Sequence, residues 1–312
     1  MYQKLAGGPV ATAANRLEQY QNTIRAFRNV GYDYATVRGS DFSFPQGDRQ
    51  HASSISANEG ALIHDRASFQ AYPWPDPAAF DYSILATIAP HLPHGMKLIV
   101  MGPGGVLENV MALVGYDATC YMIMDDPKLA TEIFAAVGER LVRHYELAAP
   151  YATVGALISN DDWGFKTQPM FSPADMRRFV LPWHRKIAAT IHAAGKPAIL
   201  HSCGCLHALM DNIIDDLKYD GKHSYEDAIM PVEQAYEQWH SRTAILGGLD
   251  LDFVCRSTPQ AVQERAAAML TRSAKRGSYA LGTGNSVPVY VPPANYFAMV
   301  TAATGLAYSQ YL

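Results

Sequence analysis

The sequence predicts an α/β protein in which parallel strands alternate with helices, folded as one (β/α)8 barrel over residues 1–312. Three observations support this fold class. Short apolar runs alternate with helical spacings about seven times along the chain. Polar or Gly residues follow each apolar run. The composition, 49% hydrophobic and 17% charged, is that of a globular chain with ample apolar material for one large core.

The predicted elements follow one another in regular order. An eighth strand is not evident, and residues 1–12 are either loosely ordered or hold a short first strand. The segment 39–80 is long, aromatic-rich and without clear periodicity, which is typical of a functional loop or lid inserted in the barrel. The predicted strands are 34–37, 97–101, 154–158, 197–201, 219–225, 243–246 and 278–281. The predicted helices are 14–29, 80–88, 106–114, 127–148, 172–194 with a kink at Pro182, 206–217, 231–241, 257–275 and 292–303.

Charge and cysteine content narrow the classes of function. The net charge is -4 and the pI is near 6.2, which is too acidic for a nucleic-acid surface. No run of 18 apolar residues and no N-terminal signal pattern occurs, so we expect a cytoplasmic protein without a membrane segment. Four Cys residues in a chain of this length are not a disulfide framework.

A His and a Cys stand two residues apart where the fourth predicted strand ends. Residues i and i+2 of a strand point to the same face, so His201 and Cys203 could bind one metal ion together. The alternative is a buried Cys beside a hydrogen-bonded core His. The position of the pair at a strand end favours the metal interpretation, because chemistry in such barrels lies at the C-terminal strand ends.

Further candidate residues stand at the other strand ends and would converge on the same cavity. Asp161 and Asp162 are adjacent carboxylates suited to acid/base work, although Asp residues also stabilise turns. The candidates for catalysis are Asp161, Asp162, Asp250 and Asn285, and those for substrate binding are Arg38, Trp163 and Tyr290.

The order of motifs in the second half resembles the uroporphyrinogen decarboxylase superfamily. The motifs are His-Ser-Cys-Gly at 201–204, Glu226, Gly-Gly-Leu-Asp at 247–250, Gly-Thr-Gly-Asn-Ser-Val at 282–287 and Pro-Pro-Ala-Asn at 292–295. The His-x-Cys-Gly form is similar to the cobalamin-dependent methyltransferase branch, which includes the methylcobamide:coenzyme M methyltransferases. The resemblance covers residues 120–312 well and the first hundred weakly.

This resemblance implies a barrel enzyme that uses zinc to activate a thiol or another methyl acceptor. It implies that His201 and Cys203 are zinc ligands, and that a corrinoid is held by a separate carrier protein that would be the partner. The resemblance also implies a small-molecule methyl donor or acceptor, and it allows a homodimer. Where the family has a third ligand, a later Cys between glycines, this chain has Thr283. Glu226 is our preferred substitute, and Cys205 is the alternative.

Two other functions stay open from the sequence. One is metal-independent decarboxylation of a porphyrinogen-like polycarboxylate. That substrate calls for clustered Arg residues, and the Arg-Gln-Ala-Gly-Arg motif of true uroporphyrinogen decarboxylases is not found here. The other is metal or corrinoid binding without catalysis, which the missing Cys favours.

Overall fold

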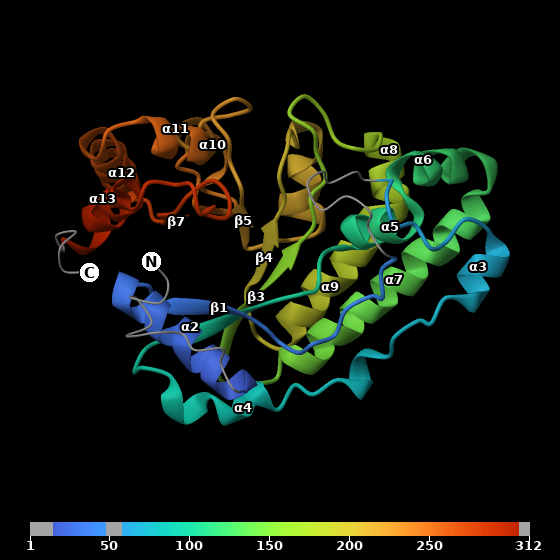
Figure 1. Ribbon diagram of the computed structural model, residues 1–312. Helices are drawn as coiled ribbons and strands as arrows, with labels where there is room; N and C mark the ends of the chain where they lie inside the picture. Colours follow the sequence, from blue (N-terminus) through green and yellow to red (C-terminus); the bar gives the residue numbers. More distant parts are fainter. Residues whose placement is uncertain (1–14, 48–57, 306–312) are drawn as a thin grey trace.

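Seven parallel strands form one curled sheet whose order in space follows the order along the chain (Figure 1). The computed structural model describes residues 15–47 and 58–305. Every neighbouring pair of strands is parallel, which confirms the alternation expected from the sequence. The strands are β1 (Tyr34–Arg38), β2 (Lys97–Met101), β3 (Val154–Asn160), β4 (Ala198–His201), β5 (Gly221–His223), β6 (Ala244–Leu246) and β7 (Tyr279–Ala280).

The predicted eighth strand is not among the described residues, so the sheet is a seven-stranded partial barrel. Residues 1–12, the proposed place for a short first strand, lie outside the described part. Helices stand around the strands (Figure 1). They are α2 (Arg16–Val30), α3 (Arg66–Ala71), α4 (Ile84–Thr87), α5 (Val106–Val114), α6 (Tyr116–Asp125), α7 (Pro127–Ala148), α8 (Pro173–Asp175), α9 (Leu181–Ala193), α10 (Val232–Trp239), α11 (Leu251–Arg256), α12 (Pro259–Ser273) and α13 (Pro293–Thr304).

The first and last helices cover the side of the barrel between β7 and β1. Side chains of α2 share a small hydrophobic cluster with α11, α12 and α13, including Val30 and Phe297. The hydroxyls of Tyr32 and Tyr296 lie 3.0 Å apart, which joins the two ends of the fold by a hydrogen bond. The larger core fills the space between the strands and the remaining helices. No helix in the described ranges combines the length and the apolar character that crossing a membrane requires.

Local sequence signals account for most of the helix boundaries. Asp126 accepts from Leu129 N at 2.9 Å and Pro127 follows it, so α7 starts where an N-cap and a first-turn proline predict. The predicted helix 172–194 is interrupted by a π-helical turn at Met176–Val180. This turn lies just before Pro182, whose ring and missing N–H are incompatible with a regular helical turn.

Two predicted helices differ from the structure. The segment 206–217 forms a 3-10 turn at His207–Leu209 and a π-helical turn at Asn212–Asp216, and not one α-helix. The segment 80–88 is helical only over α4, followed by a 3-10 turn at Ala89–His91. Of the irregular stretch 39–80, the described part contains α3 and a 3-10 turn at Pro77–Ala79, and residues 48–57 lie outside the described part.

A buried histidine on α7 should make the stability of the fold depend on pH. His144 is 1% exposed, stacks on Phe42 and shares a 2.9 Å hydrogen bond with the Tyr82 hydroxyl. Burial lowers the pKa of His144 from 6.5 to about 4. The unfolded chain therefore binds more protons than the folded chain between these values, and the contribution of His144 to stability is lost as pH falls through this window.

When the pH falls from 7 to 5, we expect the His144→Gln variant to lose less stability than the unchanged protein. Integrating the linkage relation over that interval gives a difference of about 2 kcal/mol in the free energy of unfolding. Urea titrations of both proteins at the two pH values measure it. Equal losses in the two proteins would contradict the assignment of a proton-linked role to His144.

Candidate metal centre

The ends of β3 and β4 and the loops after them bring together three side chains that could hold a metal ion. The ligand atoms of Asp162, His201 and Cys203 all lie within 4.8 Å of one another. His201 Nε2 is 3.7 Å from Cys203 Sγ and 3.7 Å from Asp162 Oδ1. Tetrahedral zinc with ordinary bond lengths would place an N–S pair about 3.6 Å apart and an N–O pair about 3.3 Å apart. The donor set and its spacing therefore fit a zinc ion with small adjustments.

Backbone contacts hold these two loops together. Asp161 N donates to His201 O at 2.9 Å, Cys203 N donates to Asp162 Oδ1 at 2.8 Å, and Cys205 N donates to Phe165 O at 2.8 Å. Gly204 has φ +91°, and a Cβ there would lie 2.2 Å from the Gly164 carbonyl. Only glycine fits this backbone conformation and this approach. The backbone contacts between the two loops therefore fix the distance between Asp162 and Cys203.

The Cys203 sulfur receives two hydrogen bonds, one from the loop after β5 and one from the loop after β7. Ser224 Oγ donates from 3.2 Å, and Asn285 Nδ2 donates from 3.1 Å. Burial, and then the charge of Asp162, raises the pKa of the Cys203 thiol to about 12. A bound cation would displace this proton, because a thiol that coordinates a metal ion is deprotonated. The two donors would then stabilise the negative sulfur, which gives Asn285 a defined place in the site.

A second histidine, His223 at the end of β5, lies directly against His201. The two residues are partners in the parallel register of β4 and β5, and their rings meet edge to edge with centroids 4.9 Å apart. Their Nδ1 atoms are 2.6 Å apart, and His223 Nε2 is 3.1 Å from Thr283 O. Burial lowers the pKa of His223 to about 4 and also lowers the pKa of His201. The sequence interpretation missed His223, although alignment of strand ends 201 and 223 could have indicated it.

Asp161, predicted to be catalytic, is turned away from the three ligands and is fully buried. Its carboxylate accepts from Leu107 N at 2.9 Å and Glu108 N at 2.8 Å, two amides in the first turn of α5. It also accepts from His184 Nε2 at 2.8 Å. These contacts are those of an N-cap supplied by another strand, so the structure gives Asp161 a supporting role. Burial, and then the charge of Asp161, raises the pKa of nearby Glu108 to about 8.

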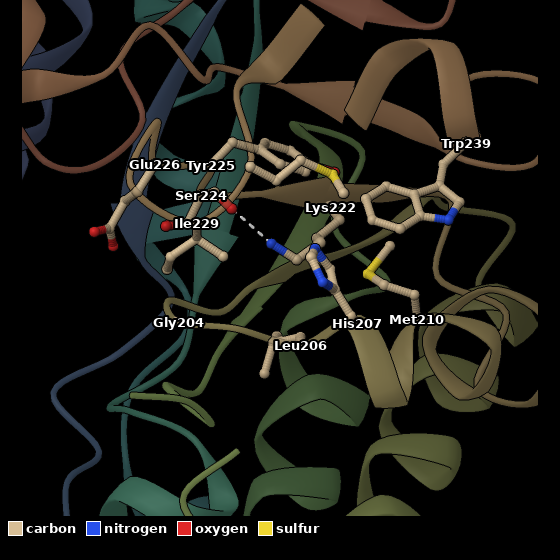
Figure 2. A pocket seen from close by; sticks show the side chains of 11 residues that line it. Gly204, Leu206, His207, Met210, Lys222, Ser224, Tyr225, Glu226, Ile229 and Trp239 are labelled. Atoms are coloured by element: carbon tan, nitrogen blue, oxygen red, sulfur yellow. Dashed lines mark hydrogen bonds between the residues drawn. The ribbon is translucent and has the colours of Figure 1, made fainter. Parts of the chain in front are cut away.

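The preferred third ligand, Glu226, is not in the cluster, and neither is Cys205. Glu226 begins the turn that leads to Met230 and borders a neighbouring pocket. Figure 2 shows its carboxylate directed away from the other side chains that line this pocket. The nearest carboxylate to His201 and Cys203 is that of Asp162, which the strand register aligns with them because β3 and β4 are neighbours. The structure therefore offers Asp162 as a candidate third ligand beside His201 and Cys203, and the ligand role of Glu226 stays a prediction.

Zinc affinity should distinguish these two carboxylates. We expect Asp162→Asn to weaken zinc binding roughly tenfold or more, since an amide is a poorer ligand than a carboxylate but still accepts from Cys203 N. Glu226→Gln should leave the affinity unchanged. Competition titration with a chromophoric chelator measures both variants. A loss in Glu226→Gln together with normal binding by Asp162→Asn would restore the sequence-based assignment.

The remaining predicted residues occupy separate places. Trp163 is fully buried, with its ring centroid 4.7 Å from that of His184, and its substrate role stays a prediction. Asp250 caps α11 through Phe253 N and also accepts from Asp227 N. Arg38 is exposed at the end of β1, and Tyr290 is 72% exposed in the segment between β7 and α13. The catalytic role of Asp250 and the substrate roles of Arg38 and Tyr290 stay predictions.

A small pocket, open to solvent, lies beside β5, and a buried lysine lines it (Figure 2). Lys222 is 3% exposed and donates to the carbonyl oxygens of Ser202 at 3.2 Å and Ser224 at 2.6 Å. Burial lowers the pKa of Lys222 to about 8. Because Ser202 precedes Cys203, the ammonium group ties the ligand loop after β4 to the end of β5.

Comparison with solved structures supports the fold. A methyltransferase from Methanosarcina mazei superposes with a TM-score of 0.66 at 14% identity, covering 97% of this chain and 90% of its own. A GH27 β-L-arabinopyranosidase from Geobacillus stearothermophilus gives a TM-score of only 0.40 at 10% identity, covering 91% of this chain and 70% of its own, which is too low to carry an argument. No curated protein sequence is significantly similar to this chain.

A family model places the chain more firmly. The model for uroporphyrinogen decarboxylase matches residues 54–306, which is most of the sequence and includes every strand from β2 to β7. The match extends the motif resemblance of residues 120–312 into the N-terminal half. The likeness to the Methanosarcina methyltransferase agrees with it at the level of the fold. The chain therefore belongs to the uroporphyrinogen decarboxylase family.

Proposed function

We propose that this protein is a zinc-dependent methyltransferase that moves a methyl group between a small molecule and a corrinoid held by a partner protein. The observation that carries the proposal is the cluster of Asp162, His201 and Cys203 at the ends of β3 and β4. A carboxylate, an imidazole and a thiolate are all common zinc ligands. Three protein ligands leave a fourth position for a substrate, which is the arrangement of catalytic zinc sites.

The replacement of the expected third Cys by Thr283 does not count against a metal site here. Cys203 as a thiolate and Asp162 as a carboxylate bring two negative charges to a divalent ion, the same number that two thiolates bring. Thr283 contributes its backbone carbonyl, which accepts from His223, and its hydroxyl donates to Asn285 O at 2.7 Å. The position thus supports the histidine and Asn285 without ligating the metal.

In this proposal each residue has a defined part in methyl transfer. Zinc lowers the pKa of a bound thiol or hydroxyl and so makes it a better nucleophile or leaving group. His201, Cys203 and Asp162 hold the ion, while Ser224 and Asn285 donate to the Cys203 sulfur. Transfer to or from a corrinoid would take place at this end of the strands, and the family resemblance motivates a carrier protein as the partner.

The test is methyl transfer by zinc-loaded protein, with Cys203→Ala as the inactive control. Methylcobalamin is mixed with a panel of small thiols, and reduced cobalamin with a panel of aromatic methyl ethers. Demethylation or methylation of the corrinoid is followed by absorbance. We expect zinc-dependent turnover in at least one combination, and none with the variant.

Other outcomes would support the other functions. Release of carbon dioxide from a porphyrinogen by metal-free protein, with no corrinoid reaction, would replace the proposal with the decarboxylase function. Stoichiometric zinc binding without turnover of any methyl compound would favour a binding protein without catalysis.

A further inference from the structure

His201 and His223, which face each other through their Nδ1 atoms, can share their protons in only one way when both rings are neutral. Thr283 O lies 3.1 Å from His223 Nε2, and a carbonyl oxygen only accepts, so His223 carries its proton on Nε2. Its Nδ1 is then an acceptor. The proton between the two Nδ1 atoms, 2.6 Å apart, must therefore belong to His201.

This arrangement leaves the lone pair of His201 on Nε2. That atom is the one that lies 3.7 Å from Cys203 Sγ and 3.7 Å from Asp162 Oδ1. A metal ligand must offer a lone pair, and the hydrogen bond of the other ring nitrogen determines which nitrogen has one. His201 is thus held in the tautomer that can bind a metal ion between the three side chains.

Asp162 alone would favour the opposite tautomer. Its carboxylate faces His201 Nε2 and would attract a proton to that atom in the metal-free protein. Without an acceptor at Nδ1, His201 would turn an N–H toward the place where the metal must bind. His223 opposes this tendency by accepting from Nδ1.

The fold is shaped to keep His223 in this position. The register of β4 and β5 sets His223 opposite His201. Gly247, with φ +70°, lies where a Cβ would be 2.3 Å from Thr283 O and 2.8 Å from His223 Nε2. A larger residue there would separate the carbonyl from the ring. His223 at the end of β5, Gly247 after β6 and Thr283 after β7 therefore meet at the hydrogen bond between His223 Nε2 and Thr283 O.

We propose that His223 is a positioning residue that, through its bond to Thr283 O, fixes the His201 tautomer with Nε2 free for the metal. The inference rests on the metal centre of the proposed function. It assigns His223 a task that none of the three ligands performs, and it explains why the carbonyl at position 283 matters where the side chain does not ligate.

The test uses two substitutions at His223 and one control. His223→Leu removes the acceptor, and we expect it to lose about 10- to 100-fold in zinc affinity, the usual cost of removing a partner of a ligand. His223→Gln restores an acceptor for His201 and a donor for Thr283 O, so it should recover most of the affinity. His144→Gln, at a buried histidine outside the site, should bind zinc as the unchanged protein does.

Nitrogen-15 NMR of the histidine rings in metal-free protein gives a readout that is independent of zinc. We expect His201 to be protonated on Nδ1 in the unchanged protein and in His223→Gln, and on Nε2 in His223→Leu. A proton on Nε2 of His201 in the unchanged protein would overturn the inference. So would equal zinc affinities of folded His223→Leu and His223→Gln, with folding checked by circular dichroism. If the unchanged protein binds no zinc, the proposed function fails while the NMR result still decides the tautomer.

Discussion

Replacing Cys203 with alanine is expected to abolish stoichiometric zinc binding while the protein stays folded. The thiolate is the softest of the three donors, and its loss leaves only Asp162 and His201. Removal of an outer partner of a ligand usually costs 10- to 100-fold in metal affinity. Loss of the ligand itself should cost more, roughly a thousandfold. Elemental analysis of protein purified without an affinity tag that binds metal, before and after dialysis, measures the effect.

Cys205→Ala is the matched control for this experiment. Cys205 is two residues away on the same loop, and its backbone N–H donates to Phe165 O whichever side chain is present. The Cys205→Ala variant should therefore retain about one zinc per chain. Zinc that persists in Cys203→Ala and disappears in Cys205→Ala would contradict the assigned ligand set and leave Cys203 as a residue of the wall.

Replacing Asp161 with alanine is expected to cause the largest loss of stability among the residues discussed, about 3 to 5 kcal/mol in the free energy of unfolding. The reason is that its buried carboxylate satisfies two amides at the start of α5 and the His184 ring. Without this carboxylate, the amides of Leu107 and Glu108 and the ring N–H of His184 would have no acceptor. The melting temperature should fall by roughly 5 to 8 °C.

The neighbouring carboxylate provides the contrast. Asp162→Asn keeps the acceptor for Cys203 N, and Asp162 is 36% exposed, so its variant should lose only about 1 kcal/mol. Thermal unfolding of metal-free protein compares the two variants directly. Equal losses in both would show that Asp161 has no special structural role. Two adjacent Asp residues would thus separate support of the fold from binding of the metal.

The sequence was sufficient to predict the strands and to bring His201 and Cys203 together as candidate ligands, since both predictions depend on local patterns. Apolar runs marked the strands other than β5, and the spacing of His201 and Cys203 placed both on one face of a strand end. Which residue can serve as the third candidate ligand depends on which strand ends are neighbours in the sheet. Glu226 is close to Cys203 along the chain, but the β3–β4 pairing brings Asp162 closer in space.

The roles of Asp161 and Asp162 could not be separated from the sequence. Adjacent residues leave a strand in different directions, and only the position of α5 shows which of the two is buried. A Cβ at Gly105 would lie 2.0 Å from Asp161 Cβ, so this helix approaches the strand end as closely as glycine allows. Such an approach between residues 105 and 161 is a tertiary contact that no local pattern encodes.

The hydrogen bonds between the two ligand loops also bear on how the ion enters and leaves. Asp161, Cys203 and Cys205 donate backbone N–H bonds across the loops, and none of these bonds depends on a metal ion. In small zinc fingers, by contrast, the ligands come together only as the chain folds around the metal. A chelator should therefore remove zinc from this protein without unfolding it, and the empty protein should take up cobalt(II) as readily. Reversible exchange of zinc for cobalt(II), followed by absorbance, is thus an expected consequence of the close backbone contact between Gly164 and Gly204.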